Sequence, residues 1–222
     1  MNGALYFSAD DGVHGKELWK MDSQGNIGML KDINPGSLGS VPTNFTVVGS
    51  TLFFSANDGV HGFELWKTDG TAANTVMVKD VEPGVVGSYP QNMVNLNGTL
   101  IYEAYGPGAG YELFRSDGTD SGTYMVMDIN PGPYNSGPSN LTVVGSTVFF
   151  TANDGTHGIE LWKTDGTAAN TSLVMDINPG STGSYPAHLT NVNGTLFFAA
   201  NDGTDGVELW KSDGTTAGTS LV

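Results

Sequence analysis

Short runs of apolar residues separated by polar turns recur along the chain, and four such runs make up each repeated segment. In the second segment the runs cover residues 44–48, 51–56, 63–68 and 75–81, and the turns between them are rich in Asn, Asp and Gly. Runs of this length that alternate, or are almost continuously apolar, are typical of β-strands. Gly or Pro interrupts every candidate helical period, so we expect strands and no helices.

An eight-residue motif marks the repeat. It reads Glu-Leu-Trp-Lys-Thr-Asp-Gly-Thr at residues 64–71 and 160–167, and Ser212 replaces the first Thr in the copy at 208–215. A looser copy at 112–119 has Phe114 in place of Trp, and a shorter copy occupies 17–23. The copies begin at residues 17, 64, 112, 160 and 208, which gives spacings of 47, 48, 48 and 48. A near-constant period of this length indicates a repeat architecture.

Each full period holds three tight turns and one long connection with a proline near each end, as at residues 82–90. This order describes a four-stranded antiparallel blade whose outer strand connects to the inner strand of the next blade. We therefore predict an all-β fold, a β-propeller-like array of five four-stranded antiparallel blades, in a single repeat domain that covers residues 1–222. The blades are expected at about residues 1–40, 41–88, 89–136, 137–184 and 185–222.

The first segment begins one strand late. Residues 2–8 match the second strand of a blade, so we expect the first blade to lack its inner strand. Proteins normally cover an unpaired sheet edge. A neighbouring molecule or a continuation of the chain is the expected partner, and we predict self-association or stacking on neighbouring repeats of a longer chain.

The charge balance narrows the choice of ligands. The chain has 23 acidic and 8 basic residues, a net charge of −15, and no cysteine. Binding to nucleic acid or anionic lipid requires clustered Lys and Arg, so we expect no nucleic-acid partner, whereas cations are attracted. No apolar run approaches the roughly 18 residues that span a bilayer, so membrane insertion is not expected. The start at Met1 shows no signal peptide, and any export signal is expected elsewhere.

The repeated motif resembles the ELWxxDGT repeat, which occurs in large exported or surface proteins, mostly of bacteria. The resemblance covers nearly the whole chain in five copies. It implies a β-propeller-like repeat in an extracellular or cell-surface protein, and it implies no reaction. The first copy lacks the Gly-Thr ending and the third lacks the Trp, so these two are the weaker matches.

Acidic residues recur in the polar turns and at the start of each motif. Two carboxylates plus turn carbonyls are the oxygen ligands that Ca²⁺ prefers. The candidate metal ligands are Asp11, Glu17, Asp58, Glu64, Asp154, Glu160, Asp202, Asp205 and Glu208. Two alternatives stay open: Asn, Asp and Gly favour turns for local reasons, and the glutamates could accept hydrogen bonds from backbone amides of the next blade.

Two other repeated positions have aromatic or imidazole side chains. Trp66 and its equivalents either pack between neighbouring blades or form a platform on which a sugar stacks, and packing is the favoured interpretation. His14, His61 and His157 occupy one turn position, each without a second His or Cys nearby, which argues against zinc.

These features favour a non-catalytic protein. Arg115 is the single arginine, no serine lies in a nucleophile elbow, and no Gly-rich phosphate loop opens a helix. The sequence therefore predicts a structural or adhesive repeat module of an extracellular protein, stabilised by Ca²⁺ and self-assembling into a fibre or longer array. The alternative is a carbohydrate-binding, lectin-like five-bladed propeller, with glycans as partners.

Overall fold

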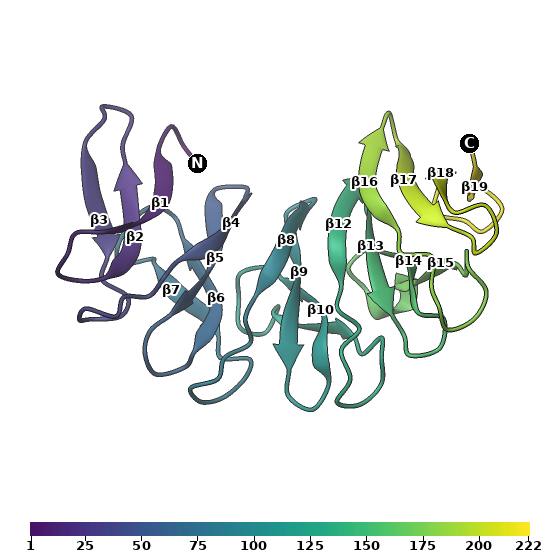
Figure 1. Ribbon diagram of the computed structural model, residues 1–222. Helices are drawn as coiled ribbons and strands as arrows, with labels where there is room; N and C mark the ends of the chain where they lie inside the picture. Colours follow the sequence, from purple (N-terminus) through teal and green to yellow (C-terminus); the bar gives the residue numbers. More distant parts are fainter.

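A computed structural model describes all residues, 1–222, and contains five antiparallel β-sheets (Figure 1). The second strands of the sheets are β1 (Leu5–Asp10), β5 (Thr51–Asn57), β9 (Thr99–Gly106), β13 (Thr147–Asn153) and β17 (Thr195–Asn201). The third strands are β2 (Lys16–Met21), β6 (Phe63–Thr68), β10 (Gly110–Ser116), β14 (Ile159–Thr164) and β18 (Val207–Ser212). The fourth strands are β3 (Ile27–Lys31), β7 (Val76–Lys79), β11 (Tyr124–Met127), β15 (Ser172–Met175) and β19 (Ser220–Leu221).

Only four sheets have an inner strand. These strands are β4 (Thr43–Val48), β8 (Gln91–Leu96), β12 (Ser139–Val144) and β16 (Ala187–Val192), and the first sheet has the order β1-β2-β3. The predicted array of five blades, with the first blade lacking its inner strand, is confirmed. The single helical segment is the 3₁₀ turn η1 (Ala168–Asn170). No helix is long and apolar enough to cross a membrane.

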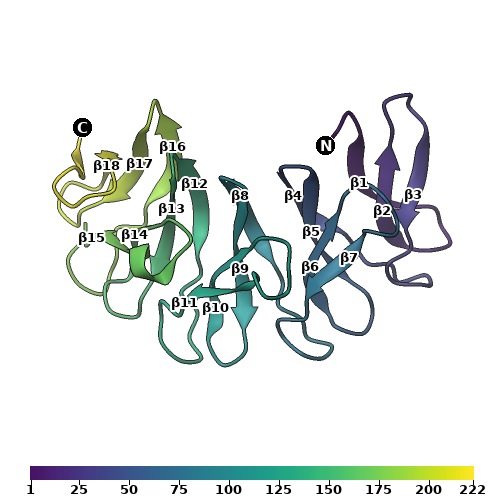
Figure 2. The ribbon, with the colours of Figure 1, turned by 180° about the vertical axis from the view of Figure 1, so that it is seen from behind.

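The five blades follow one another along an open arc. Successive inner strands contact each other, β4 with β8, β8 with β12 and β12 with β16. Figures 1 and 2 show the sheet of β1–β3 at one end of the arc and the sheet of β16–β19 at the other. Each end blade therefore has a neighbour on one side only.

The apolar core lies between the blades. Four clusters of buried side chains occur, and each cluster combines residues of two consecutive blades. In one of them, Leu65 and Val78 of blade 2 pack with Leu100, Tyr102 and Phe114 of blade 3. Burial of apolar surface is the main favourable contribution to folding. Most of that contribution therefore arises where one blade stacks on the next.

The Asp-Gly-Thr turns also contact the preceding blade. Gly118 has a φ of +87°, and a Cβ added to it would lie 3.2 Å from the ring of Phe53 in blade 2. Lys67 of blade 2 donates a hydrogen bond of 2.7 Å to the carbonyl of Gly118. The equivalent bonds run from Lys20 to Gly70, from Arg115 to Gly166 and from Lys163 to Gly214. The glycine therefore provides both the left-handed turn and the close approach between blades.

Candidate functional site

A buried glutamate anchors each connection between consecutive blades. The carboxylate of Glu64 accepts hydrogen bonds from the backbone N–H groups of Val81 and Glu82, both at 3.3 Å, and of Ser88 at 2.9 Å. The hydroxyl of Ser88 donates a fourth bond at 2.5 Å. Glu17, Glu112 and Glu160 accept bonds of the same kind from their own connections.

These carboxylates are fully buried. Burial raises the pKa of Glu64, Glu112 and Glu160, and the surrounding donors oppose that shift. Of the two roles that the sequence left open, the structure shows hydrogen bonding to backbone amides. The donors belong to the connection that leads to the next blade, whereas the sequence interpretation placed them in the next blade itself.

A serine extends this link to the following blade. Ser88 donates its N–H and hydroxyl to Glu64, and its carbonyl accepts a bond of 2.7 Å from the N–H of Tyr105 in blade 3. Ser40, Ser136 and Ser184 make equivalent bonds to Asn57, Asn153 and Asn201. The sequence interpretation missed these serines, although each lies 23 or 24 residues after its glutamate.

The last copy of the motif has different surroundings. Glu208 and Leu209 are exposed in blade 5, although the same positions in blades 1–4 are buried. No hydrogen bond to the Glu208 side chain is formed in the structure. The motif alone therefore does not determine how its residues are used, because their partners come from the connection and the next blade.

The polar turns after the second strands are stabilised internally. Oδ1 of Asp58 accepts bonds from the N–H groups of Val60 and His61, and Oδ2 lies 2.7 Å from Nδ1 of His61. Burial alone would raise the pKa of Asp58, but its hydrogen bonds with His61 and Val60 together outweigh that effect and lower it. The Asp58 side chain in turn raises the pKa of His61. The pairs Asp11–His14 and Asp154–His157 have the same separation.

Most of the predicted calcium ligands already accept hydrogen bonds from other groups of the protein. Glu17, Glu64 and Glu160 are occupied by donors from the connections, and the turn aspartates by amides and histidines. In the last turn Asp202 accepts bonds from the N–H groups of Thr204 and Asp205. No group of three or more His, Cys, Asp or Glu side chains in the structure could hold a metal ion. Calcium dependence therefore stays a prediction of the sequence.

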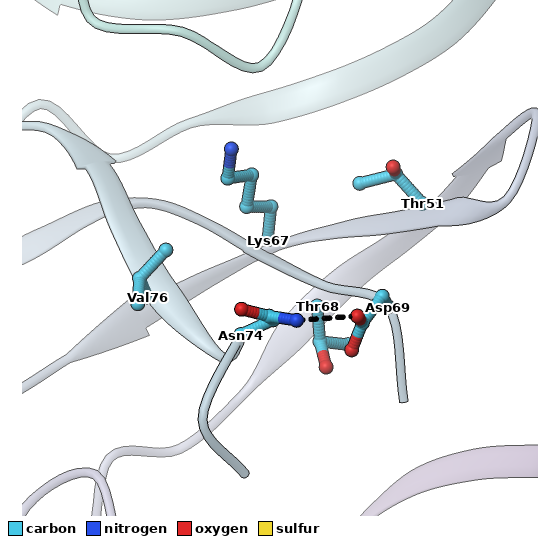
Figure 3. A pocket seen from close by; sticks show the side chains of 6 residues that line it. All are labelled: Thr51, Lys67, Thr68, Asp69, Asn74 and Val76. Carbon is cyan, nitrogen blue, oxygen red and sulfur yellow. Dashed lines mark hydrogen bonds between the residues drawn. The ribbon is translucent and has the colours of Figure 1, made fainter. Parts of the chain in front are cut away.

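A polar cavity recurs beside the Asp-Gly-Thr turns. In blade 2 it measures about 280 Å³ and is lined by six residues, among them Lys67, Asp69 and Asn74 (Figure 3). Asn74 donates a bond of 2.6 Å to Asp69, so these polar groups satisfy each other within the turn. A cavity of about 270 Å³ occurs at the matching place in blade 4. Neither cavity is lined by an aromatic ring, which argues against sugar stacking there.

The tryptophans of the motif lie inside the junctions. Trp66, Trp162 and Trp210 are buried, each in a cluster shared with the preceding blade, and Phe114 is buried at the equivalent position. Trp19, which has no preceding blade, is only half-buried. The prediction that these rings pack between neighbouring blades is therefore confirmed. The buried rings do not form a platform for a sugar.

The third copy breaks the symmetry of the array. Its second strand places Glu103 opposite Gln91, at a position that is Ser55, Thr151 or Ala199 in other blades. Glu103 is 6% exposed and accepts a bond of 2.6 Å from the side chain of Asn92. Burial raises the pKa of Glu103. The sequence showed the substitution but gave no sign of its partners.

Comparison with known proteins shows a fold and no family. No family model matches the chain, and no curated protein matches its sequence. Among solved structures, the chain is similar to puromycin hydrolase, with a TM-score of 0.55 and 17% identity over 100% of this chain and 38% of that chain. It is similar to a prolyl endopeptidase structure with a TM-score of 0.60 and 12% identity, over 100% of this chain and 35% of that one.

A third likeness is to the β-propeller domain of the Trilobed protease from Pyrococcus furiosus. The TM-score is 0.55 and the identity 8%, over 99% of this chain and 67% of that chain. The sheets, their order and these likenesses place the protein in the β-propeller class. The chain spans little more than a third of the two peptidase-related proteins, and at these identities the likeness concerns the fold alone.

Proposed function

We propose that the protein is a non-catalytic structural repeat module that extends its array by stacking blade on blade. The next blade belongs either to neighbouring repeats of a longer chain or to a second copy. The resemblance of the motif to repeats of exported proteins supports an extracellular or cell-surface location. One observation is central to the proposal: the two end faces of the arc expose the side chains that the internal junctions bury.

The trailing face of a blade is the face that packs on the following blade, and the leading face packs on the preceding one. On the trailing face of blade 5, Leu209 is 50% exposed, whereas Leu65 at the same position of blade 2 is 0% exposed. On the leading face of blade 1, Leu5 is 55% exposed, whereas Leu52 is 3% exposed. Each end face therefore exposes a leucine that the same face of an interior blade buries.

Such a contact is head-to-tail, so it can repeat without closing. We expect purified protein to associate with increasing concentration, as measured by sedimentation velocity. Leu209→Asp removes the trailing contact and Leu5→Asp the leading contact, so neither variant should associate alone. A mixture of the two should form a one-to-one dimer, because each still has one intact face.

Leu38→Asp is the matched control, because Leu38 is exposed in a connection and belongs to neither end face. It should associate as the unmodified protein does. A protein that stays monomeric at every concentration, or a mixture of the two face variants that stays monomeric, would contradict stacking on a second copy and would leave neighbouring repeats of a longer chain as the source of the next blade.

Calcium stabilisation is a separate proposal with weaker support. The net charge of −15 attracts cations. Four aspartates that open the connections each have one buried carboxylate oxygen without a donor: Asp32, Asp80, Asp128 and Asp176. If calcium binds, EDTA lowers the melting temperature and added Ca²⁺ restores it. No change in either direction removes calcium from the account and leaves the stacking proposal untouched.

A further inference from the structure

A cavity at the junction of blades 2 and 3 differs from the polar cavities of the Asp-Gly-Thr turns. It measures about 230 Å³ and lies where β4, β5 and β6 meet the end of the following connection. Its lining includes the aromatic side chains Phe63 and Tyr89 and the polar side chains Asn44, Ser55 and Gln91. None of its eight lining residues is charged.

The two aromatic rings form a stacked pair. The ring centroids of Phe63 and Tyr89 are 5.6 Å apart, with an angle of 30° between the planes. Tyr89 is 43% exposed, so the pair offers an accessible aromatic surface at the cavity. Ile159 stands at the position of Phe63 in blade 4, so the equivalent Tyr185 has no aromatic partner there. The stacked pair thus occurs at one junction of the array.

The backbone of Tyr89 adopts a conformation that is unfavourable for a tyrosine. Its φ is +49°, in the left-handed region, and its N–H donates a 2.9 Å bond to the carbonyl of Phe63. Blade 3 has Gly137 at the matching position, with a φ of +58°, which costs far less. Val41 and Tyr185, at the same position of the connections after blades 1 and 4, have φ values of +49° and +51°, so this backbone conformation is shared along the array.

A buried carboxylate lies next to the polar side of the cavity. Gln91 and Asn92 lie at the start of β8; Gln91 pairs with Glu103 in the strand register, and the Asn92 side chain donates a 2.6 Å hydrogen bond to the Glu103 carboxylate. Glu103 is 6% exposed and is the single carboxylate at this strand position in the five blades. A buried charged acceptor orients the amide groups that donate to it. Asn92 is therefore held next to Gln91, which lines the cavity together with the aromatic pair.

The aromatic surface continues into blade 3. Tyr105 and Tyr111 are in edge-to-face contact, with ring centroids 5.6 Å apart. The N–H of Tyr105 donates a 2.7 Å bond to the carbonyl of Ser88, which places this tyrosine pair close to Tyr89. The aromatic surface thus extends beyond the cavity from Tyr89 to Tyr105 and Tyr111, and amide and carboxylate groups border it.

We propose that this surface binds a neutral oligosaccharide, with a sugar ring stacked on Tyr89 and its hydroxyl groups hydrogen-bonded to Gln91, Asn44 and Ser55. A pyranose presents C–H groups on its faces and hydroxyl groups at its edge, which matches an aromatic surface bordered by amides and hydroxyls. The uncharged lining and the adjacent Glu103 disfavour anionic sugars. The inference goes beyond the stacking function and concerns residues outside the two end faces.

Binding is tested by calorimetric titration of the full chain with four neutral probes: cellohexaose, chitohexaose, mannohexaose and maltohexaose. At least one probe should bind saturably, and a galacturonate hexamer should not. Tyr89→Ala should weaken binding about tenfold through loss of the stacking surface. Tyr185→Ala is the matched control, because it removes a tyrosine at the same position of blade 4 and should leave affinity unchanged.

Phe63→Ile introduces the residue that blade 4 already uses and keeps the fold intact while removing the stacked pair. It should weaken binding in the same direction as Tyr89→Ala. The proposal is overturned if no neutral probe binds, if the galacturonate hexamer binds best, or if Tyr89→Ala and Tyr185→Ala have equal effects. None of these results bears on self-association, which sedimentation measures independently.

Discussion

Blades 2 and 5 share nearly the same motif but use it differently. In blade 2, Glu64 holds the connection and Leu65 is sealed by blade 3, whereas Glu208 and Leu209 in blade 5 are exposed. The difference lies in the neighbour, because the donors to the glutamate and the cover over the leucine both come from outside the sheet. The comparison shows that the motif residues make their contacts at the junction between blades. A blade without a following neighbour lacks these contacts.

The largest expected difference concerns the glutamates. Glu64→Ala leaves the buried N–H and hydroxyl of Ser88, and the part-buried N–H groups of Val81 and Glu82, without their acceptor, and each fully buried group costs about 1–3 kcal/mol. We expect a loss of about 3–5 kcal/mol in the free energy of unfolding, measured by urea titration. Glu208→Ala should change it by less than about 0.5 kcal/mol, as is usual at exposed positions. Equal losses in the two variants would show that the glutamate acts within its own sheet.

The leucines that follow these glutamates should show the same contrast between interior blades and blade 5, with a smaller loss in the free energy of unfolding. Leu161→Ala opens a cavity in the cluster between blades 4 and 5, at a cost of about 3 kcal/mol. Leu209→Ala removes a half-exposed side chain and should cost less than about 1 kcal/mol. Melting temperatures from calorimetry measure both. A cost at Leu209 as large as that at Leu161 would mean that blade 5 is already covered in solution, which the concentration dependence of the melting temperature would reveal.

The lysines that cross each junction should have a modest effect. Lys67→Met removes the bond to the carbonyl of Gly118 but keeps the apolar length of the side chain. The expected loss is about 1 kcal/mol, which is typical of a hydrogen bond to a charged donor that is partly exposed. Lys211→Met in blade 5 has no such bond to lose and should be neutral. Reversal of this order in urea titrations would contradict the assignment of these lysines to the junctions.

The smallest expected effect comes from the Asp–His turns, which do not depend on a neighbouring blade. The Asp58 side chain raises the pKa of His61, so the folded state binds a proton more tightly than the unfolded state. This contribution to stability is present below the ordinary histidine pKa of 6.5 and is lost as pH rises through the raised value. Asp58→Asn should return the pKa of His61 towards its ordinary value, as followed by NMR, while His14 and His157 serve as internal controls.

The same turn in blade 5 has Asp205 at the histidine position. Asp205→His should give a histidine whose pKa is raised like that of His61, because the pairing is formed within the turn. An ordinary pKa for the introduced histidine would show that this turn, too, depends on its surroundings.

The fold was predictable because each blade repeats the same local signals. The alternation of strands, the Asn-Gly and Asp-Gly turns and the fixed spacing predicted four strands per blade and the missing inner strand of blade 1. The burial of Trp66 and its equivalents followed from the same pattern. Side chains alternate between the two faces of a strand, so the position of Trp66 in its strand indicates the sheet face on which it packs.

The roles of the polar residues were less predictable because their partners are distant in the sequence. Glu64 binds amides 17 and more residues away, so the choice between metal ligand and backbone acceptor required the structure. The aromatic pair joins Phe63 to Tyr89 across a connection. This pair occurs in one copy of the repeat only. A comparison of the positions that all copies share therefore does not reveal it.

The central claim is that stability resides at the junctions, and hydrogen exchange of single backbone amides tests it most directly. Amides of β6, β10 and β14, which lie between two neighbours, should exchange on the order of 100-fold more slowly than those of β18 in dilute solution. That result would follow from the extra contacts of the interior blades. Equal protection along the whole array, or the strongest protection in β18, would show that each blade is stable by itself and would contradict the account.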